Sequence, residues 1–79
     1  MKNLVQKYIQ IHPDICHGKP CFKGTRIPVS LILHMLEGGD SADAILKGYP
    51  SLNKKHIQAA LHLAGESIDR NPQLRDKAA

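Results

Sequence analysis

The sequence predicts a mainly α-helical domain in which a short N-terminal β-hairpin is followed by three helices, the last two arranged as a helix-turn-helix. Residues 20–28 place a Lys-Gly-Thr turn between two segments that can be extended. From Val29 onward the apolar residues repeat at the helical period instead. We therefore expect one domain over residues 1–79, with a strand and hairpin segment at 1–28, a helical core at 29–71 and a flexible tail at 72–79.

The hairpin is predicted from the residue types around its turn, with arms at 20–22 and 26–28. Gly24 can adopt a positive φ without steric cost, as a tight hairpin turn often requires. Pro28 fixes its own φ and disfavours a helical Ile27, so the extended segment ends where the helix can begin. The Thr25 hydroxyl is expected to satisfy backbone groups of the turn. A further short strand is expected at 8–11, where two isoleucines alternate at period two.

Three amphipathic helices are expected after the hairpin. The first ends at the glycine pair 38–39, the second begins at the N-cap Ser41, and the third begins at the N-cap Asn53 and ends at 71–72. The short connection between the last two contains Gly and Pro, which is typical of a helix-turn-helix. The apolar stripes consist of Val29, Ile32, Leu33 and Leu36, of Ala42, Ile45, Leu46 and Tyr49, and of Ile57, Ala60, Leu61, Ala64 and Ile68.

The composition indicates a thin aliphatic core. Hydrophobic residues make up 42% of the 79 residues, but aromatic residues make up only 4% and Trp is absent. Because such a small core often gains stability by self-association, we expect a homodimer.

Charge and hydropathy bear on the partners and the compartment. The net charge of +4 is compatible with an anionic partner, although an ordinary basic surface would have the same charge. No apolar run approaches the ~20 residues that span a membrane. Residues 1–11 lack the apolar block of a secretory signal. We therefore expect a cytoplasmic protein with no membrane partner.

Two cysteines and two histidines form a His-x3-Cys-His-x3-Cys pattern at His12, Cys16, His17 and Cys21. Structural zinc sites more often use two close pairs separated by a longer loop. A cysteine in a reducing compartment is usually a small buried hydrophobe. We therefore expect packing rather than zinc binding or thiol chemistry, and no metal or other cofactor.

A lysine pair opens the third predicted helix. The first helical turn is the positive end of the helix dipole, so cations are disfavoured there by ~0.3–1 kcal/mol each. Amides and ammonium groups together attract phosphate, and this end of a helix-turn-helix faces nucleic acid. Three interpretations stay open: DNA contact, an inert solvated turn, or contact with an acidic protein. The candidate DNA-binding residues are Lys54, Lys55, His56, Gln58 and His62.

A second set of residues is a candidate partner-binding surface. Arg26 is expected to pair with Asp14 and brace the hairpin, with an interface role as the alternative. Three apolar residues lie off the helical stripes, and they either bind a partner or belong to a core buried on two sides. The full candidate set is Lys19, Lys23, Arg26, Leu31, Met35 and Leu63.

Catalytic patterns are weak in this chain. It has no recognisable Ser-His-Asp context, no phosphate-cradling glycine loop and no carboxylate pair in an evident pocket. We therefore expect a binding protein rather than an enzyme.

Several of these motifs together resemble the domain-of-unknown-function family 433. The similarity covers about two thirds of the chain, from His12 to Ala64, and its spacing is specific. The matching elements are His12-Pro13, the Gly-Lys-Pro at 18–20, the Gly-Thr-Arg-Ile-Pro-Val at 24–29, Gly38-Gly39, and the Tyr-Pro-Ser-Leu at 49–52. Two features depart from the family pattern: Lys54 and Lys55 replace acidic residues, and Ala44 replaces a glutamate.

The resemblance implies a homeodomain-like helical core and an antitoxin-like role. On this interpretation the chain neutralises a PIN-like ribonuclease toxin, with operator DNA binding through the helix-turn-helix as a further capacity. The alternative is a protein–protein interaction or dimerisation module that does not bind DNA.

Overall fold

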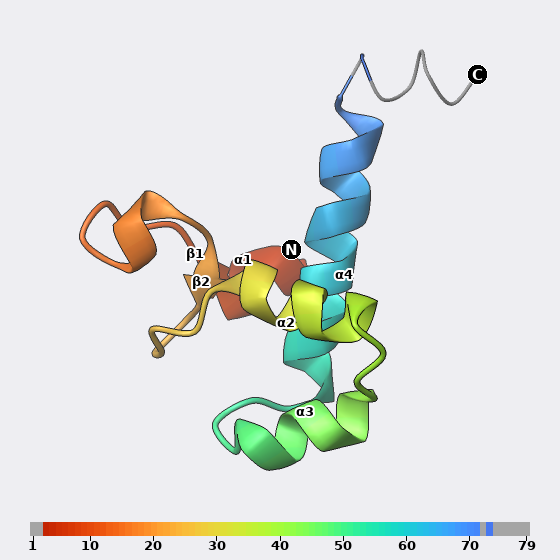
Figure 1. Cartoon of the computed structure of the whole chain (residues 1–79). Helices are drawn as coiled ribbons and strands as arrows, with labels where there is room; N and C mark the ends of the chain where they lie inside the picture. Colours follow the sequence, from red (N-terminus) through yellow and green to blue (C-terminus); the bar gives the residue numbers. More distant parts are fainter. Residues whose placement is uncertain (1–2, 72, 74–79) are drawn as a thin grey trace.

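The computed structural model describes residues 3–71 and residue 73. The predicted fold class is confirmed, because a short antiparallel strand pair precedes the main helices (Figure 1). Residue 72 and residues 74–79 of the expected tail lie outside the described residues. In chain order the elements are α1 (Leu4–Tyr8), β1 (Ile9–Gln10), the 3-10 turn η1 (Cys16–Gly18), β2 (Cys21–Phe22), α2 (Val29–Glu37), α3 (Ala42–Gly48) and α4 (Lys54–Asp69).

The predicted hairpin turn forms, but the strand partner of β2 comes from farther away in the chain. Gly24 has a φ of 76°, and the N–H of Thr25 donates to the carbonyl of Phe22 at 3.1 Å. The second predicted arm, 26–28, also pairs with β2 as expected, through a bridge between Cys21 and Pro28 and a hydrogen bond from the Phe22 N–H to the Ile27 carbonyl at 3.1 Å. The Thr25 hydroxyl bonds the turn backbone as expected, donating to the Phe22 carbonyl at 2.8 Å and accepting from the Ile27 N–H at 3.1 Å.

The pairing of β1 with β2 ties the N-terminus to the hairpin. Ile9 lies opposite Phe22, and Gln10 lies opposite Cys21. The strand predicted at 8–11 is thus two residues long, because Tyr8 belongs to the preceding helical turn.

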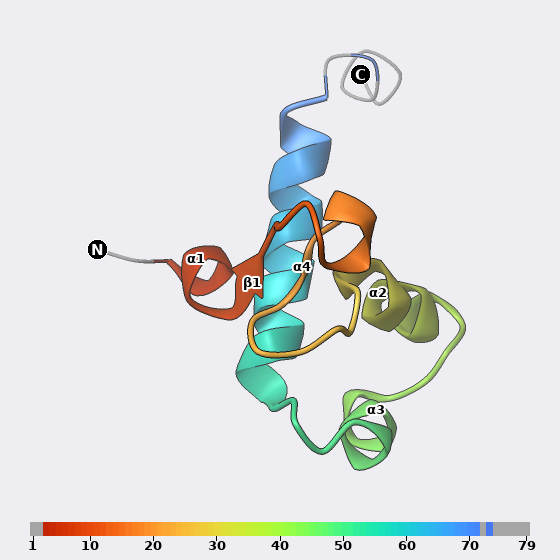
Figure 2. The ribbon, with the colours of Figure 1, turned by 90° about the vertical axis from the view of Figure 1, so that its left-hand side faces the viewer.

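Helix α1 was not predicted from the sequence. Its Asn3 cap accepts a hydrogen bond from the Gln6 N–H at 2.9 Å. Five residues are too few to show a helical period, so local patterning could not identify this turn. α1 packs against α4, and Figure 2 shows it on the opposite side of α4 from η1 and α2.

α2 and α3 begin and end at the predicted signals, whereas α4 begins after Asn53 as predicted but ends at Asp69, before the expected stop at 71–72. α2 stops at Gly38, and Gly39 follows with a φ of 100°. The Ser41 hydroxyl caps α3 by accepting from the Ala44 N–H at 3.1 Å. Among these helices and the rest of the described chain, none is both long and apolar enough to cross a membrane.

The core lies where α1, α2, α3 and the strand pair meet the N-terminal half of α4. It consists of Ile9, Cys21, Phe22, Val29, Ile32, Ile45, Leu52, Ile57, Ala59 and Ala60. The predicted α4 stripe is wrong at Leu61 and Ile68, which are 53% and 54% exposed. Since α1 and β1 also pack on α4, the buried face turns toward Ala59 and moves Leu61 outward. Ile68 lies in the last turn, where α4 extends past the other helices (Figure 1).

A left-handed turn at η1 is the most unusual backbone feature. Cys16, His17 and Gly18 have successive φ values of 53°, 56° and 78°. For residues with a Cβ this conformation costs about 1–2 kcal/mol each. The turn is closed by hydrogen bonds from the Gly18 N–H to the Ile15 carbonyl at 3.1 Å and from the Lys19 N–H to the Cys16 carbonyl at 3.0 Å.

Candidate nucleic-acid interface on helix α4

The first turn of α4 is closed by a reciprocal cap. The Asn53 side chain accepts hydrogen bonds from the N–H groups of Lys55 at 2.8 Å and His56 at 3.4 Å. In return, Nδ1 of His56 accepts from the Asn53 N–H at 3.0 Å. The amides that we expected to be open to phosphate are therefore partly occupied by the protein's own side chain. This corrects one element of the predicted phosphate site and leaves the lysines as its main groups.

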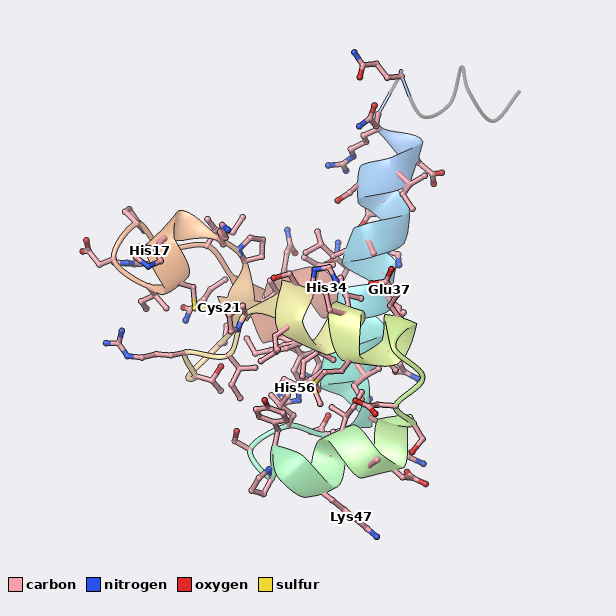
Figure 3. All side chains as sticks on the ribbon, in the orientation of Figure 1. His17, Cys21, His34, Glu37, Lys47 and His56 are labelled. Carbon is pink, nitrogen blue, oxygen red and sulfur yellow. The ribbon has the colours of Figure 1, made fainter. Side chains whose placement is uncertain are left out.

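His56 is half-buried, with its ring packed against two aromatic side chains. Its ring lies edge-on to Tyr8, with centroids 4.8 Å apart, and to Phe22 at 5.5 Å. Figure 3 shows it among the side chains beneath α2. Burial lowers the pKa of His56. The capping role and the ring contacts leave His56 less accessible to DNA than the other candidates, and its position three residues after Asn53 was the sequence signal for this role.

The remaining four candidates share one exposed face. Lys54, Gln58 and His62 follow one another at four-residue spacing, which places them on one side of the helix. Lys55 is also exposed and belongs to the same turn as Lys54. The opposite side carries the buried Ile57 and Ala60. This face can therefore meet a surface without disturbing the core.

The charges along α4 oppose its dipole. Lys54 and Lys55 stand at the positive end, while no basic residue lies in the last turn. Farther along, Glu66 pairs with His62 at 2.9 Å and with Arg70 at 3.3 Å. A carboxylate beside His62 disfavours phosphate there, so the capacity to bind phosphate concentrates at the two lysines.

The candidate partner-binding residues are divided between two places. Lys19, Lys23 and Arg26 are all exposed on the N-terminal segment. The predicted ion pair between Arg26 and Asp14 is wrong, since no such pair is formed between these two described residues. The hairpin is braced instead by the Thr25 hydroxyl and by the Cys16 thiol, which donates to the Arg26 carbonyl at 3.4 Å.

The three apolar candidates do not behave alike. Leu31 is 38% exposed, which agrees with the expectation of an exposed apolar residue. Met35 and Leu63 are half-buried and pack against the core. For these two the alternative of a helix buried on two sides is the one that the structure supports.

The two cysteines lie in different elements, Cys16 in η1 and Cys21 in β2. Cys21 is fully buried, and Cys16 is half-buried. Burial raises the pKa of the Cys16 thiol, and its hydrogen bond with Cys21 acts in the same direction. Over residues 3–71 and 73, no three His, Cys, Asp or Glu side chains are grouped to hold a metal ion.

The chain is similar to a protein of known structure and to an uncharacterized protein. A chain described as a DUF433 member protein from Anabaena variabilis has a crystal structure that matches with a TM-score of 0.71 at 31% identity, over 95% of this chain and 70% of that one. An uncharacterized protein, y4eO, from Sinorhizobium fredii is 38% identical over 48 residues. The match covers 61% of this chain but only 22% of that longer relative.

A family model also matches most of the chain. The model described as "Protein of unknown function (DUF433)" matches residues 9–64. The matched segment runs from the first strand to the outer half of α4 and so contains both the hairpin and the helix-turn-helix. The chain therefore belongs to the DUF433 family.

Proposed function

We propose that this chain is an antitoxin-like cytoplasmic binding protein that contacts operator DNA through α4 and neutralises a PIN-like ribonuclease through a separate surface. The observation that carries the DNA half is the shared exposed face of Lys54, Lys55, Gln58 and His62 on the second helix of a helix-turn-helix. In such motifs the N-terminal part of this helix enters the major groove.

Each group on this face has a defined chemical role in the proposal. The ammonium groups of Lys54 and Lys55 bind phosphates and supply affinity without sequence information. The Gln58 carboxamide lies one turn farther along and can both donate to and accept from an adenine edge. Sequence preference therefore depends on Gln58, and salt dependence on the lysines.

The DNA half is tested by fluorescence anisotropy with a labelled fragment of the chain's own promoter, measured across a salt series. We expect the Lys54→Glu/Lys55→Glu variant to lose binding and to flatten the salt slope by about 2, because each phosphate contact contributes about 0.9. The Lys19→Glu/Lys23→Glu variant makes the same change in net charge on the N-terminal segment and serves as the control. Equal losses in both variants would indicate a general charge effect and contradict the proposed face.

The ribonuclease half is supported by the resemblance to antitoxin-like proteins. Its test is co-expression with the product of the adjacent gene, followed by co-purification and an RNA-cleavage assay. We expect a stable complex and loss of cleavage at a one-to-one ratio. A neighbour that is not a nuclease, or a nuclease that stays active in the presence of the chain, would contradict this half.

The second candidate function is a protein-interaction or dimerisation module without DNA binding. The exposure of Leu31, Leu61 and Ile68 favours it, because these apolar side chains are available to a second surface. Sedimentation velocity at tens of micromolar tests the homodimer that we also propose. A monomer that binds neither DNA nor ribonuclease would contradict both candidates.

A further inference from the structure

A groove with a volume of 560 Å³ opens between α2, the outer half of α4 and the loop before β2. The α4 residues that line it belong to the part of the helix that continues past α2 (Figure 1). The residues described above as the candidate DNA face do not line it.

The two helical walls of the groove repeat at the same spacing. α2 contributes Val29, Ser30, Leu33 and His34. α4 contributes Leu63, Ala64, Ser67 and Ile68. Each set occupies positions i, i+1, i+4 and i+5, which form ridges along the i±4 direction of a helix. Grooves between such ridges accept the corresponding ridge of another helix.

The charge of the groove and of the whole chain indicates which kind of partner the groove can bind. Among the described lining residues, Lys19 is the one with a full charge at neutral pH, and it lies at the loop side of the groove. His34 also lines it and is paired with Glu37, with Nδ1 and Oε1 3.2 Å apart. The whole chain carries a net charge of +4, which favours an acidic partner over a second copy as the occupant of this groove.

We propose that this groove seats an amphipathic helix of an acidic partner protein. The partner's aliphatic side chains, spaced at i, i+3, i+4 and i+7, pack between Leu33 and Ile68, and a carboxylate pairs with Lys19. This inference rests on the partner-binding half of the proposed function and names its site.

The position of the groove has a consequence for DNA. Its α4 wall begins at Leu63, whereas the phosphate-binding lysines stand in the first turn, at the other end of the helix. A partner seated in the groove therefore leaves Lys54 and Lys55 uncovered, and both ligands can be bound together.

The test uses the full chain and a labelled helical peptide of about four turns, with leucines on one face and glutamates on the other. A peptide with lysines in place of the glutamates is the charge control. The diagnostic variant is Ile68→Glu, and Leu61→Glu is its matched control, because the two residues are 54% and 53% exposed on the same helix.

We expect the glutamate peptide to bind, with about tenfold or more loss in Ile68→Glu and less than about twofold change in Leu61→Glu. Lys19→Glu should weaken the glutamate peptide and strengthen the lysine peptide. Three results would overturn the proposal. The wild-type chain could fail to bind the glutamate peptide, Leu61→Glu and Ile68→Glu could lose the same affinity, or the two peptides could bind equally well.

Two other occupants would also overturn it. A dimer in sedimentation that Ile68→Glu dissociates and Leu61→Glu does not would identify a second copy. The amide resonances of Leu33 and Ala64 can be compared between the wild-type chain and Leu74→Glu, both without peptide. Shifts in the variant would identify the chain's own C-terminal segment as the occupant of the groove. DNA anisotropy of the wild-type chain separates the two proposals: a wild-type chain that binds DNA but does not bind the glutamate peptide would overturn this inference alone.

Discussion

Asn53 and His56 satisfy each other's backbone across the first turn of α4. The side-chain oxygen of Asn53 lies 3.4 Å from the backbone nitrogen of His56, and Nδ1 of His56 lies 3.0 Å from the backbone nitrogen of Asn53. Nδ1 can accept this bond only when it carries no proton. The protonation state of His56 is therefore linked to the start of the helix that carries the candidate DNA face.

This link predicts a loss of stability in acid. Burial lowers the pKa of His56 below the 6.5 of an ordinary imidazole, so the unfolded chain binds more protons than the folded one in that range. The stabilising contribution is fully present above about pH 6.5 and declines as the pH falls toward the folded-state pKa. Urea unfolding at a series of pH values measures it.

Two variants separate His56 from the other histidines. His56→Gln keeps an acceptor at the capping position but does not titrate, so its stability should lose this acid dependence. His62→Gln changes an exposed imidazole and should keep it. An unchanged pH profile in His56→Gln would show that another group is responsible.

The lysine pair at the start of α4 should lower the free energy of unfolding. Replacing Lys54 and Lys55 with Glu removes two cations from the positive end of α4 and places two anions there, so the free energy of unfolding should rise by at least about 1 kcal/mol at low salt. Lys47→Glu makes the same change in the last turn of α3, where a cation is favourable, and should lower stability. Thermal unfolding at low and high salt measures both. The same sign for both ends would contradict a dipole effect.

The left-handed turn predicts an inverted order of substitutions. At His17, with its φ of 56°, Gly should be more stable than Ala by about 1 kcal/mol. At His34, inside α2, Ala should be more stable than Gly by about the same amount. Four single variants compared by urea unfolding provide the measurement. Ala ahead of Gly at both positions would mean that η1 is not left-handed in solution.

Deleting one methylene should change the free energy of unfolding more at a buried isoleucine than at an exposed one. Ile32 is fully buried, and Ile32→Val should cost about 0.5–1.5 kcal/mol through the cavity it leaves. Ile68→Val, at a 54% exposed site, should change the free energy of unfolding by less than about 0.5 kcal/mol. Chemical unfolding of both variants checks this, and equal effects would indicate that the end of α4 is covered in solution.

The sequence was most informative where the determinants are local. Ser41 and Asn53 bond amides within three residues, so their caps could be predicted, as could the stop at Gly38. The candidate lysines and Gln58 could be found as polar positions off the stripe.

The misses depend on neighbours far away in the chain. β2 pairs with β1, eleven residues away between the Cys21 and Gln10 partners, in addition to the adjacent arm that the sequence predicted. The exposure of Leu61 follows from where α1 packs, which no helical stripe encodes. His56 looked like a surface cation because its aromatic neighbours come from α1 and β2.

The lysines at the positive end of α4 have a consequence for how long the protein resists proteolysis. An anion held at its lysine end supplies the counter-charge that an acidic side chain gives to most helices, so ligand and fold reinforce each other. Occupied molecules should therefore resist proteolysis longer than empty ones. The degradation rate would then report the fraction of protein molecules that hold an anion at this end of α4.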